Sequence, residues 1–338
     1  ALTANTTGSE NTAVGYQSLD ANTTGGQNVA VGAASLSANT TGSKNVAMGN
    51  ASLDANTTGT DNTAIGYGTL GLNTTGTQMV AIGYNVLAAN TTAIFNVGIG
   101  NVALQANTTG ANNVALGAAA LASNTTAAGN TALGHLALYA NTTGASNTAV
   151  GYQCLDACTT GAALTAVGHT TLGANTTGYS NVAVGGGAPY LAAAMQSNTT
   201  GYGNTALGSG AMASNTTAAS STAVGRSAMY ANSTGGNHVA VGNHALKENT
   251  TGNTNTAVGV TALGLNTTGS NNTGLGYIAG DLITTGSNNT CLGYQADPTG
   301  ATVSNEFTLG NSSVSALRCA DTSIAALSDR RDKKDIID

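Results

Sequence analysis

The chain has 338 residues, of which 41% are hydrophobic but only 7% are charged and 4% aromatic, with no Trp and 47 Gly. Compact cores are normally filled with large aromatic side chains, so this composition argues against several ordinary globular domains. It also argues against disorder, because disordered chains are rich in charge and Pro, and this chain has only two Pro. The net charge of -6 provides no basic face, so we expect no nucleic acid partner.

The cysteines and the hydrophobic pattern exclude two further classes of site. Cys154, Cys158, Cys291 and Cys319 do not form the paired spacing of a zinc site, so we expect no metal and no cofactor. Cys154 and Cys158 lie close enough in the sequence either to form a disulfide or to remain as free thiols. No apolar run approaches the ~18 residues that span a bilayer, so we expect no membrane insertion.

A repeat of 17 residues runs through the chain from its first residues. If the Asn of the motif Asn-Thr-Thr-Gly is position 0, this position falls at Asn5, Asn22, Asn39, Asn56, Asn73, Asn90, Asn107, Asn124 and Asn141, and continues through Cys158 to Asn175. It then steps by 23 residues to Asn198 and resumes the 17-residue spacing to Ile283. Internal repeats of this kind indicate a solenoid.

Each unit contains one strand signal between two glycine corners. Positions 6 to 9, as in Asn28-Val-Ala-Val31, have strand propensity, and Gly recurs at positions 3 and 10, which would destabilise a helix. At about 3.3 Å per residue the unit traces a perimeter of about 56 Å, and coils would stack about 4.8 Å apart. We therefore predict an all-β fold: a parallel β-solenoid of 17-residue coils.

Two aliphatic positions are expected to form ladders inside the coil, namely positions 9 and 14. The predicted core ladder comprises Val14, Leu19, Val31, Leu36, Met48, Leu53, Ile65 and Leu70. The Asn residues at positions 0 and 6 are expected to form side-chain amide ladders. The Ala and Gly positions suit close packing within a thin coil or against another chain, so association is expected to supply part of the stability.

Several polar and aromatic positions remain as candidate contact sites. Tyr16, Tyr67 and Tyr84 share position 11, and Tyr190 lies in an insertion near residues 185–197 that should bulge from one corner. These side chains could pack at the surface or between chains, or contact a glycan. His135 and His169 share the same position but lie two coils apart, about 10 Å, too far to share a metal.

The recurrent Asn-Thr-Thr motif admits three interpretations. It matches an N-glycosylation sequon, but we favour an unmodified polar turn, in which Asn tolerates left-handed backbone. Thr arrays on flat solenoids can also bind ice. Adjacent Thr6 and Thr7 would face opposite sides of a strand, which leaves only one outward Thr per coil.

The strand motif resembles that of a known family. Asn28-Val-Ala-Val-Gly32, with variants at residues 45–49 and 62–66, is similar to the head repeats of trimeric autotransporter adhesins. That resemblance implies a left-handed parallel β-roll packed as a homotrimeric rod, although the family coil is shorter than 17 residues. It covers residues 1–295, which we assign to the repeat shaft, followed by a cap or transition at 296–327.

The last residues carry a second resemblance. Ser328, Asp329, Lys333 and Ile336 match the pattern Ser-Asp-x-x-x-Lys-x-x-Ile, which begins the intramolecular chaperone domain of endosialidase-type phage tail fibres and tail spikes. We therefore assign residues 328–338 to the truncated start of that domain. The resemblance implies that Ser328 is a nucleophile, Lys333 its general base and Leu327–Ser328 the scissile bond of autocleavage.

These observations favour a structural and adhesive segment of a phage tail fibre, located in the virion and extracellular. It would not be an enzyme beyond autoproteolytic release of the chaperone domain. Its expected partners are two further copies of itself and a host cell-surface glycan or protein receptor. The alternatives are the head of a bacterial trimeric adhesin on the cell surface, and the subunit of a self-assembling extracellular filament.

Overall fold

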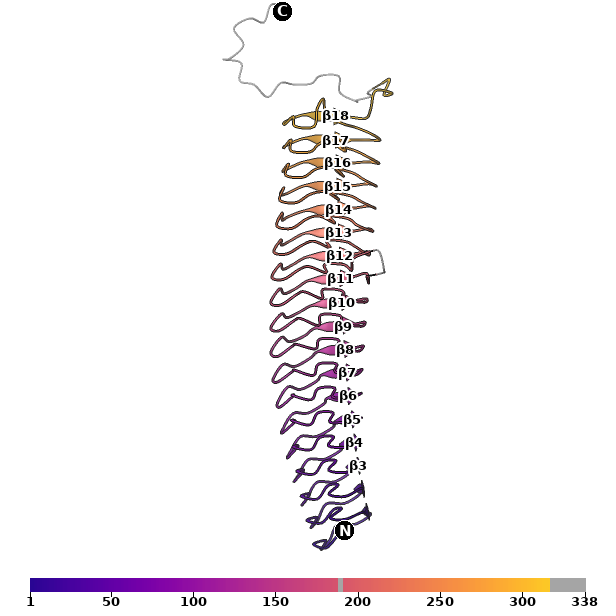
Figure 1. Ribbon diagram of the computed structural model, residues 1–338, viewed down its shortest axis with the longest axis vertical. Helices are drawn as coiled ribbons and strands as arrows, with labels where there is room; N and C mark the ends of the chain where they lie inside the picture. Colours follow the sequence, from indigo (N-terminus) through magenta and orange to yellow (C-terminus); the bar gives the residue numbers. More distant parts are fainter. Residues whose placement is uncertain (188–190, 317–338) are drawn as a thin grey trace, which may run out of the picture.

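The computed structural model describes residues 1–187 and 191–316, which form a single rod of stacked coils (Figure 1). Each coil contributes one strand of three residues, and the described part of the chain contains no helix. The strands are β1 (Thr12–Val14), β2 (Val29–Val31), β3 (Val46–Met48), β4 (Thr63–Ile65), β5 (Val80–Ile82), β6 (Val97–Ile99), β7 (Val114–Leu116), β8 (Thr131–Leu133), β9 (Thr148–Val150), β10 (Thr165–Val167), β11 (Val182–Val184), β12 (Thr205–Leu207), β13 (Thr222–Val224), β14 (Val239–Val241), β15 (Thr256–Val258), β16 (Thr273–Leu275), β17 (Thr290–Leu292) and β18 (Phe307–Leu309).

The strands form one parallel sheet in which each pairs with the next along the chain. Thr12 pairs with Val29, and every later pair repeats this register. Between β11 and β12 the partners are Val182 and Thr205, so six additional residues leave the register intact. The predicted parallel β-solenoid of 17-residue coils is thus confirmed.

A glycine corner ends each strand at position 10. At Gly117, φ is 135°, and a Cβ atom there would lie 2.5 Å from the carbonyl oxygen of Gly134 in the next coil. Only glycine occupies this backbone region readily, and only glycine allows the neighbouring coil to stack so closely. This requirement explains why position 10 is Gly in the repeat.

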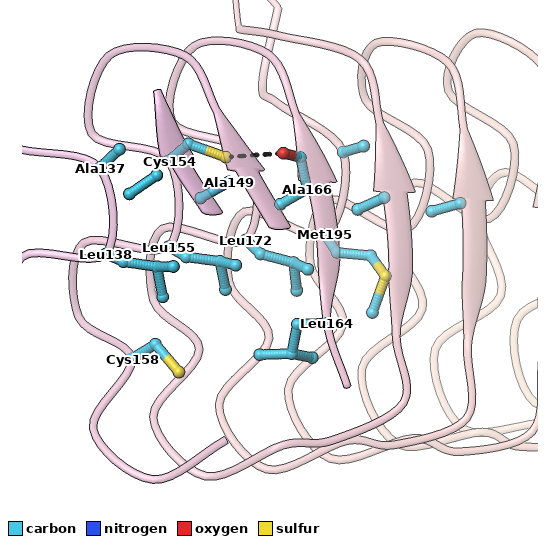
Figure 2. Packing of buried hydrophobic residues seen from close by; sticks show 14 of the residues in the cluster. Ala137, Leu138, Ala149, Cys154, Leu155, Cys158, Leu164, Ala166, Leu172 and Met195 are labelled. Carbon is cyan, nitrogen blue, oxygen red and sulfur yellow. Dashed lines mark hydrogen bonds between the residues drawn. The ribbon is translucent and has the colours of Figure 1, made fainter. Parts of the chain in front are cut away.

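The interior of the coil is narrow and is filled mainly by the residues at positions 8 and 13, which are usually small, and by a large apolar side chain at position 14. Ala at position 8 points inward from the strand, and Leu at position 14 faces it from the opposite side, as Ala149 and Leu155 show in Figure 2. Both side chains are completely buried. The predicted burial of Leu19, Leu36, Leu53 and Leu70 is confirmed, since each is 0% exposed.

The prediction that position 9 also lies inside the coil is wrong. Val14, Met48 and Ile65 are 58%, 42% and 36% exposed, and Val31 is only half-buried. In a strand, the residue at position 8 and its neighbours at positions 7 and 9 point to opposite sides, and here the Ala at position 8 points inward. The space opposite Leu accepts a methyl group but not a branched chain, so the aliphatic residue points outward.

Two amide ladders run along the rod, as predicted. At position 0, Nδ2 of Asn39 donates to Oδ1 of Asn22 at 2.8 Å and to the carbonyl oxygen of Gly42 at 2.9 Å. At position 6 the bonds join side chain to backbone instead: Oδ1 of Asn28 accepts from the backbone N–H of Asn45 at 3.0 Å. These asparagines are fully buried, so the ladders satisfy polar groups that would otherwise be costly inside the coil.

The remaining sides of the coil use left-handed backbone at residues other than glycine. Positions 5, 12 and 14 have φ near +50 to +60°, as at Asn112, Ala119 and Leu121. This conformation is unfavourable for most L-residues by about 1–2 kcal/mol. The stacked hydrogen bonds hold it; for example, the N–H of Leu121 donates to the carbonyl of Ala137 at 3.0 Å.

Candidate functional site

The most extensive candidate site is the outer strand face, which we define as the outward side chains at positions 7 and 9 of all the strands. Position 7 is Thr or Val in β1 to β17 and Phe307 in β18, while position 9 is Val, Ile, Leu or Met. No charged residue occurs in either column of the described strands. The face is therefore uncharged along the whole rod, with one continuous aliphatic column at position 9 beside a mixed column of Thr and Val at position 7.

The area of the outer strand face is large for a surface in contact with water. Eighteen strands about 4.8 Å apart extend about 80 Å, and two columns about 7 Å apart cover on the order of 500 Å². Leu275, Val239 and Leu133 are 51%, 41% and 44% exposed. The largest apolar patch of a typical soluble monomer is of similar size, about 300–600 Å², and such patches are often functional.

The aromatic side chains form short stacks along the outside of the rod. Tyr67 and Tyr84 stack with ring centroids 5.5 Å apart, and Tyr152 lies between His135 and His169 at 5.5 and 5.3 Å. Stacking covers the ring faces, so ring edges and hydroxyl groups remain outward. A sugar that needs an open ring face would find one only at the end of a stack.

Other predicted aromatic contacts differ from these stacks. Tyr16 is 75% exposed, and Tyr190 lies outside the described residues. Tyr179 and Tyr202 stack at 4.9 Å across the insertion, at position 4 rather than 11. Sequence reasoning missed this pair because the six-residue insertion separates the two rings by 23 positions.

A shallow groove of about 550 Å³ lies beside Tyr67. Small residues such as Gly71 and Ala88 line it together with Leu72, Asp54 and Gln105. The lining thus offers one carboxylate and one side-chain amide among mostly apolar residues. It is a candidate contact surface.

The Asn-Thr-Thr-Gly segment forms a sharp corner rather than a flat side. The backbone N–H groups of Thr6, Thr7 and Gly8 all donate to the carbonyl oxygen of Thr23. In the next coil Thr24 is exposed at the apex, whereas Thr23 is half-buried and its Oγ1 donates to the carbonyl of Thr40 at 3.0 Å. One Thr per coil is therefore outward, as predicted, but these residues form a ridge and not the plane that an ice surface would require.

The sequon asparagines lie inside the coil. Asn22 is 0% exposed, and its Nδ2 donates to Oδ1 of Asn5 at 2.9 Å and to the carbonyl of Gly25 at 3.0 Å. Both amide hydrogens are thus in use. The folded coil does not present this nitrogen for glycosylation, which favours the unmodified polar turn.

The cysteines of the described coils are free and buried. Cys154 Sγ donates to the carbonyl oxygen of Ala166 at 3.2 Å, on the opposite side of the coil from Cys158 (Figure 2). Burial raises the pKa of Cys154 to about 12 and that of Cys158 to about 11. Of the two possibilities, the structure has free thiols and not a disulfide.

Ionisable groups are scattered along the rod. Within residues 1–187 and 191–316, no three His, Cys, Asp or Glu side chains gather as a possible metal-binding group. The same residues contain no helix long and apolar enough to cross a membrane. The predicted dyad of Ser328 and Lys333, with the bond after Leu327, lies outside the described residues, as does Cys319.

The fold and its surfaces define a repetitive parallel β-solenoid whose distinguishing feature is an uncharged outer sheet face with a continuous exposed aliphatic column. A scan against protein-family models gives no match, and a search of curated proteins finds none that is similar.

Proposed function

We propose that the chain is the shaft segment of a phage tail fibre, a homotrimer in which three rods pack through their outer strand faces. The observation that carries this proposal is the uncharged face along β1 to β18, with its exposed aliphatic column at position 9. Packing between copies would remove this column from water, at a gain of about 25 cal/mol per Å² of apolar surface.

The choice of three chains and of a phage fibre rests on the two resemblances. The outward Val-Ala-Val strand motif resembles that of the trimeric adhesin heads, where chains pack in threes. The match of Ser328, Asp329, Lys333 and Ile336 to the start of an intramolecular chaperone domain supports a fibre that trimerises with assistance and releases that domain by autocleavage. The fibre would hold a receptor-binding tip or contact the host surface along its sides.

Contacts with the host would use the sides that remain outward in such a trimer. The aromatic stacks, the threonine ridge and the groove beside Tyr67 present edges, hydroxyl groups and amides along the rod. These groups suit weak, repeated polar contacts with a cell-surface glycan or protein. The rod itself provides a rigid spacer with regularly repeated contacts, without a catalytic centre.

The proposal is tested by the molar mass in solution, measured by light scattering on the purified chain. We expect three times the chain mass of 32.7 kDa. Val184→Glu and Leu207→Glu place carboxylates on the outer strand face near the middle of the rod, and should reduce the mass to that of one chain or cause aggregation. The matched control is Gln78→Glu, at the exposed position 5 where Glu10 occurs naturally.

Two outcomes would overturn the proposal. One is a monodisperse monomer of the unsubstituted chain at micromolar concentration. The other is a trimer that tolerates both glutamate substitutions, which would place the contacts on another side of the coil. To test autocleavage, Ser328→Ala should keep intact a longer chain that includes the full chaperone domain.

A further inference from the structure

One residue in the buried ladders is titratable in the acid range, namely His238. It occupies position 6, where most coils have Asn, and it is 1% exposed. The coil before it has Ser221 at the same position, and Ser221 Oγ accepts the backbone N–H of His238 at 3.1 Å. The small serine side chain leaves room for the larger imidazole.

His238 reproduces both hydrogen bonds of the asparagine it replaces. In a typical coil, Asn45 Nδ2 donates to the carbonyl of Gly59, fourteen residues ahead, and its Oδ1 accepts the N–H of Asn62. His238 Nδ1 accepts the N–H of Asn255 at 3.1 Å, and the ring is hydrogen-bonded to the backbone of Gly252, again fourteen residues ahead. The imidazole is therefore neutral, with its proton on Nε2.

We propose that His238 makes the junction between the coils of β14 and β15 an acid-labile seam, that is, a boundary at which two stacked coils separate in acid. Protonation would place a hydrogen on Nδ1, directly opposite the N–H of Asn255. Two donors would then face each other in a buried site that water does not reach. The seam would have to open for the ring to become charged.

The groups that face the ring offer no compensation for a positive charge. Ser221 lies in the coil before, and the side chain of Asn249 lies 3.3 Å from Nε2 in the coil after. Neither is titratable, and neither are Asn232, Asn255 and Gly252. The nearby charged residues, Arg226, His244, Lys247 and Glu248, belong to positions 11, 12, 15 and 16, and none of them is buried.

The direction of the pH effect follows from burial. Burial lowers the pKa of His238 from 6.5 to about 4. The opened junction, where the ring meets water, has the ordinary pKa, so the stabilisation is complete above pH 6.5 and is lost as the pH falls toward 4. These values correspond to a rise of roughly 100-fold in the opening equilibrium between pH 7 and pH 4.

Opening at one junction does not require the rest of the rod to unfold. Coils of a solenoid contact only their neighbours, so stability is a sum of local terms. The fourteen strands from β1 to β14 and the strands from β15 onward would each keep their own stacking. The consequence is a hinge at a fixed point of the rod in acid.

The test compares the whole chain with His238→Asn, which restores the usual residue of this position. Pepsin digestion at pH 4 should cut the unsubstituted rod within residues 232–260 at least tenfold faster than the variant. His135→Asn, an exposed histidine of position 11, is the matched control and should digest like the unsubstituted chain. Both variants retain every carboxylate, so general acid effects cancel.

A second measurement does not depend on the variant folding. NMR of chains with labelled histidine should show one ring, absent in His238→Asn, that titrates below pH 5. If the signal that is absent in His238→Asn titrated near 6.5, or if pepsin cleaved the unsubstituted chain and His238→Asn equally, the proposal would be overturned. Preferential cleavage at another junction would overturn the assignment of the seam to His238.

Discussion

Asn141 and Cys158 occupy the same position in consecutive coils, and Oδ1 of Asn141 is buried without a hydrogen-bond donor among the described residues. In coils with Asn at this position, Oδ1 accepts from the next Asn, as Asn39 Nδ2 does with Asn22 at 2.8 Å. Cys158 interrupts the ladder because its Sγ is directed to the carbonyl of Gly161 at 3.7 Å. The rod therefore has a weak point within its ninth and tenth coils.

Restoring the ladder should stabilise these coils. We expect Cys158→Asn to raise the free energy of local opening by about 1–2 kcal/mol, since it pairs a buried acceptor. The measurement is hydrogen exchange of the amides in residues 141–161. Cys158→Ala is the control: it removes the thiol but supplies no donor, so an equal gain in both variants would contradict the explanation.

The thiols of the folded rod should be unreactive at pH 8. Because burial raises the pKa of Cys154 to about 12 and that of Cys158 to about 11, only about one Cys158 in a thousand is a thiolate at pH 8. Iodoacetamide labelling followed by peptide mass spectrometry should find both residues unmodified in the folded chain. The same reagent should label both in guanidinium; rapid labelling without denaturant would show that the coils open readily.

The narrow interior predicts a compensating pair at Val86 and Gly98. Gly98 replaces the usual inward Ala of position 8, and a Cβ atom there would lie 2.6 Å from Cγ1 of Val86. We expect Gly98→Ala to cost about 1–3 kcal/mol by overpacking and Val86→Ala about 2 kcal/mol by leaving a cavity. The double variant should regain most of both losses, because it recreates the equivalent pair of the next coils, Ala103 and Ala115.

A double-mutant cycle of chemical denaturation measures this coupling. An interaction free energy of about 2 kcal/mol in favour of the double variant is the expected result. Additive losses would show that Val86 and Gly98 do not share one space. Gly71→Ala is a useful control, since a Cβ atom there comes no closer than 3.4 Å to any neighbour and the unfolding free energy should barely change.

Much of this fold could be predicted from the repeat. Its period fixed the register, and the burial of Leu19 and the ladder of Asn22 followed from periodic apolar and amide positions. The outward side of Val14 could not be predicted, because alternation along a strand allows either Ala13 or its neighbours to point inward. Which side points inward depends on the width of the coil, and that width is set by residues with left-handed backbone such as Leu19. Leucine has no preference for this conformation, so the sequence does not reveal it.

The candidate surfaces were also only partly predictable, because the repeat does not show which side of each strand points outward. Stacking of Tyr67 on Tyr84 follows from their shared position, but the outer strand face became evident only when position 9 was found to be exposed. His238 carried a signal that was missed: it is a histidine at a position where most coils have asparagine. A substitution of this kind within a buried ladder indicates that the replacement must reproduce the hydrogen bonds of the ladder.

Left-handed backbone at position 5 gives a prediction about stability at the surface. Phe95 has φ of 59° and is 47% exposed, while Asn271 holds the same position in another coil with φ of 58°. Asn tolerates this conformation far better than a bulky aromatic residue. We therefore expect Phe95→Asn to raise the unfolding free energy by about 1 kcal/mol.

The reverse substitution, Asn271→Phe, supplies the matched control and should lower the unfolding free energy by a similar amount. Guanidinium denaturation followed by circular dichroism measures both changes. If Phe95→Asn instead destabilised the chain, the Phe95 ring would have to make contacts worth more than the relief of backbone strain. The solution mass of each variant should be determined as well, because loss of trimer in Phe95→Asn alone would place those contacts between chains.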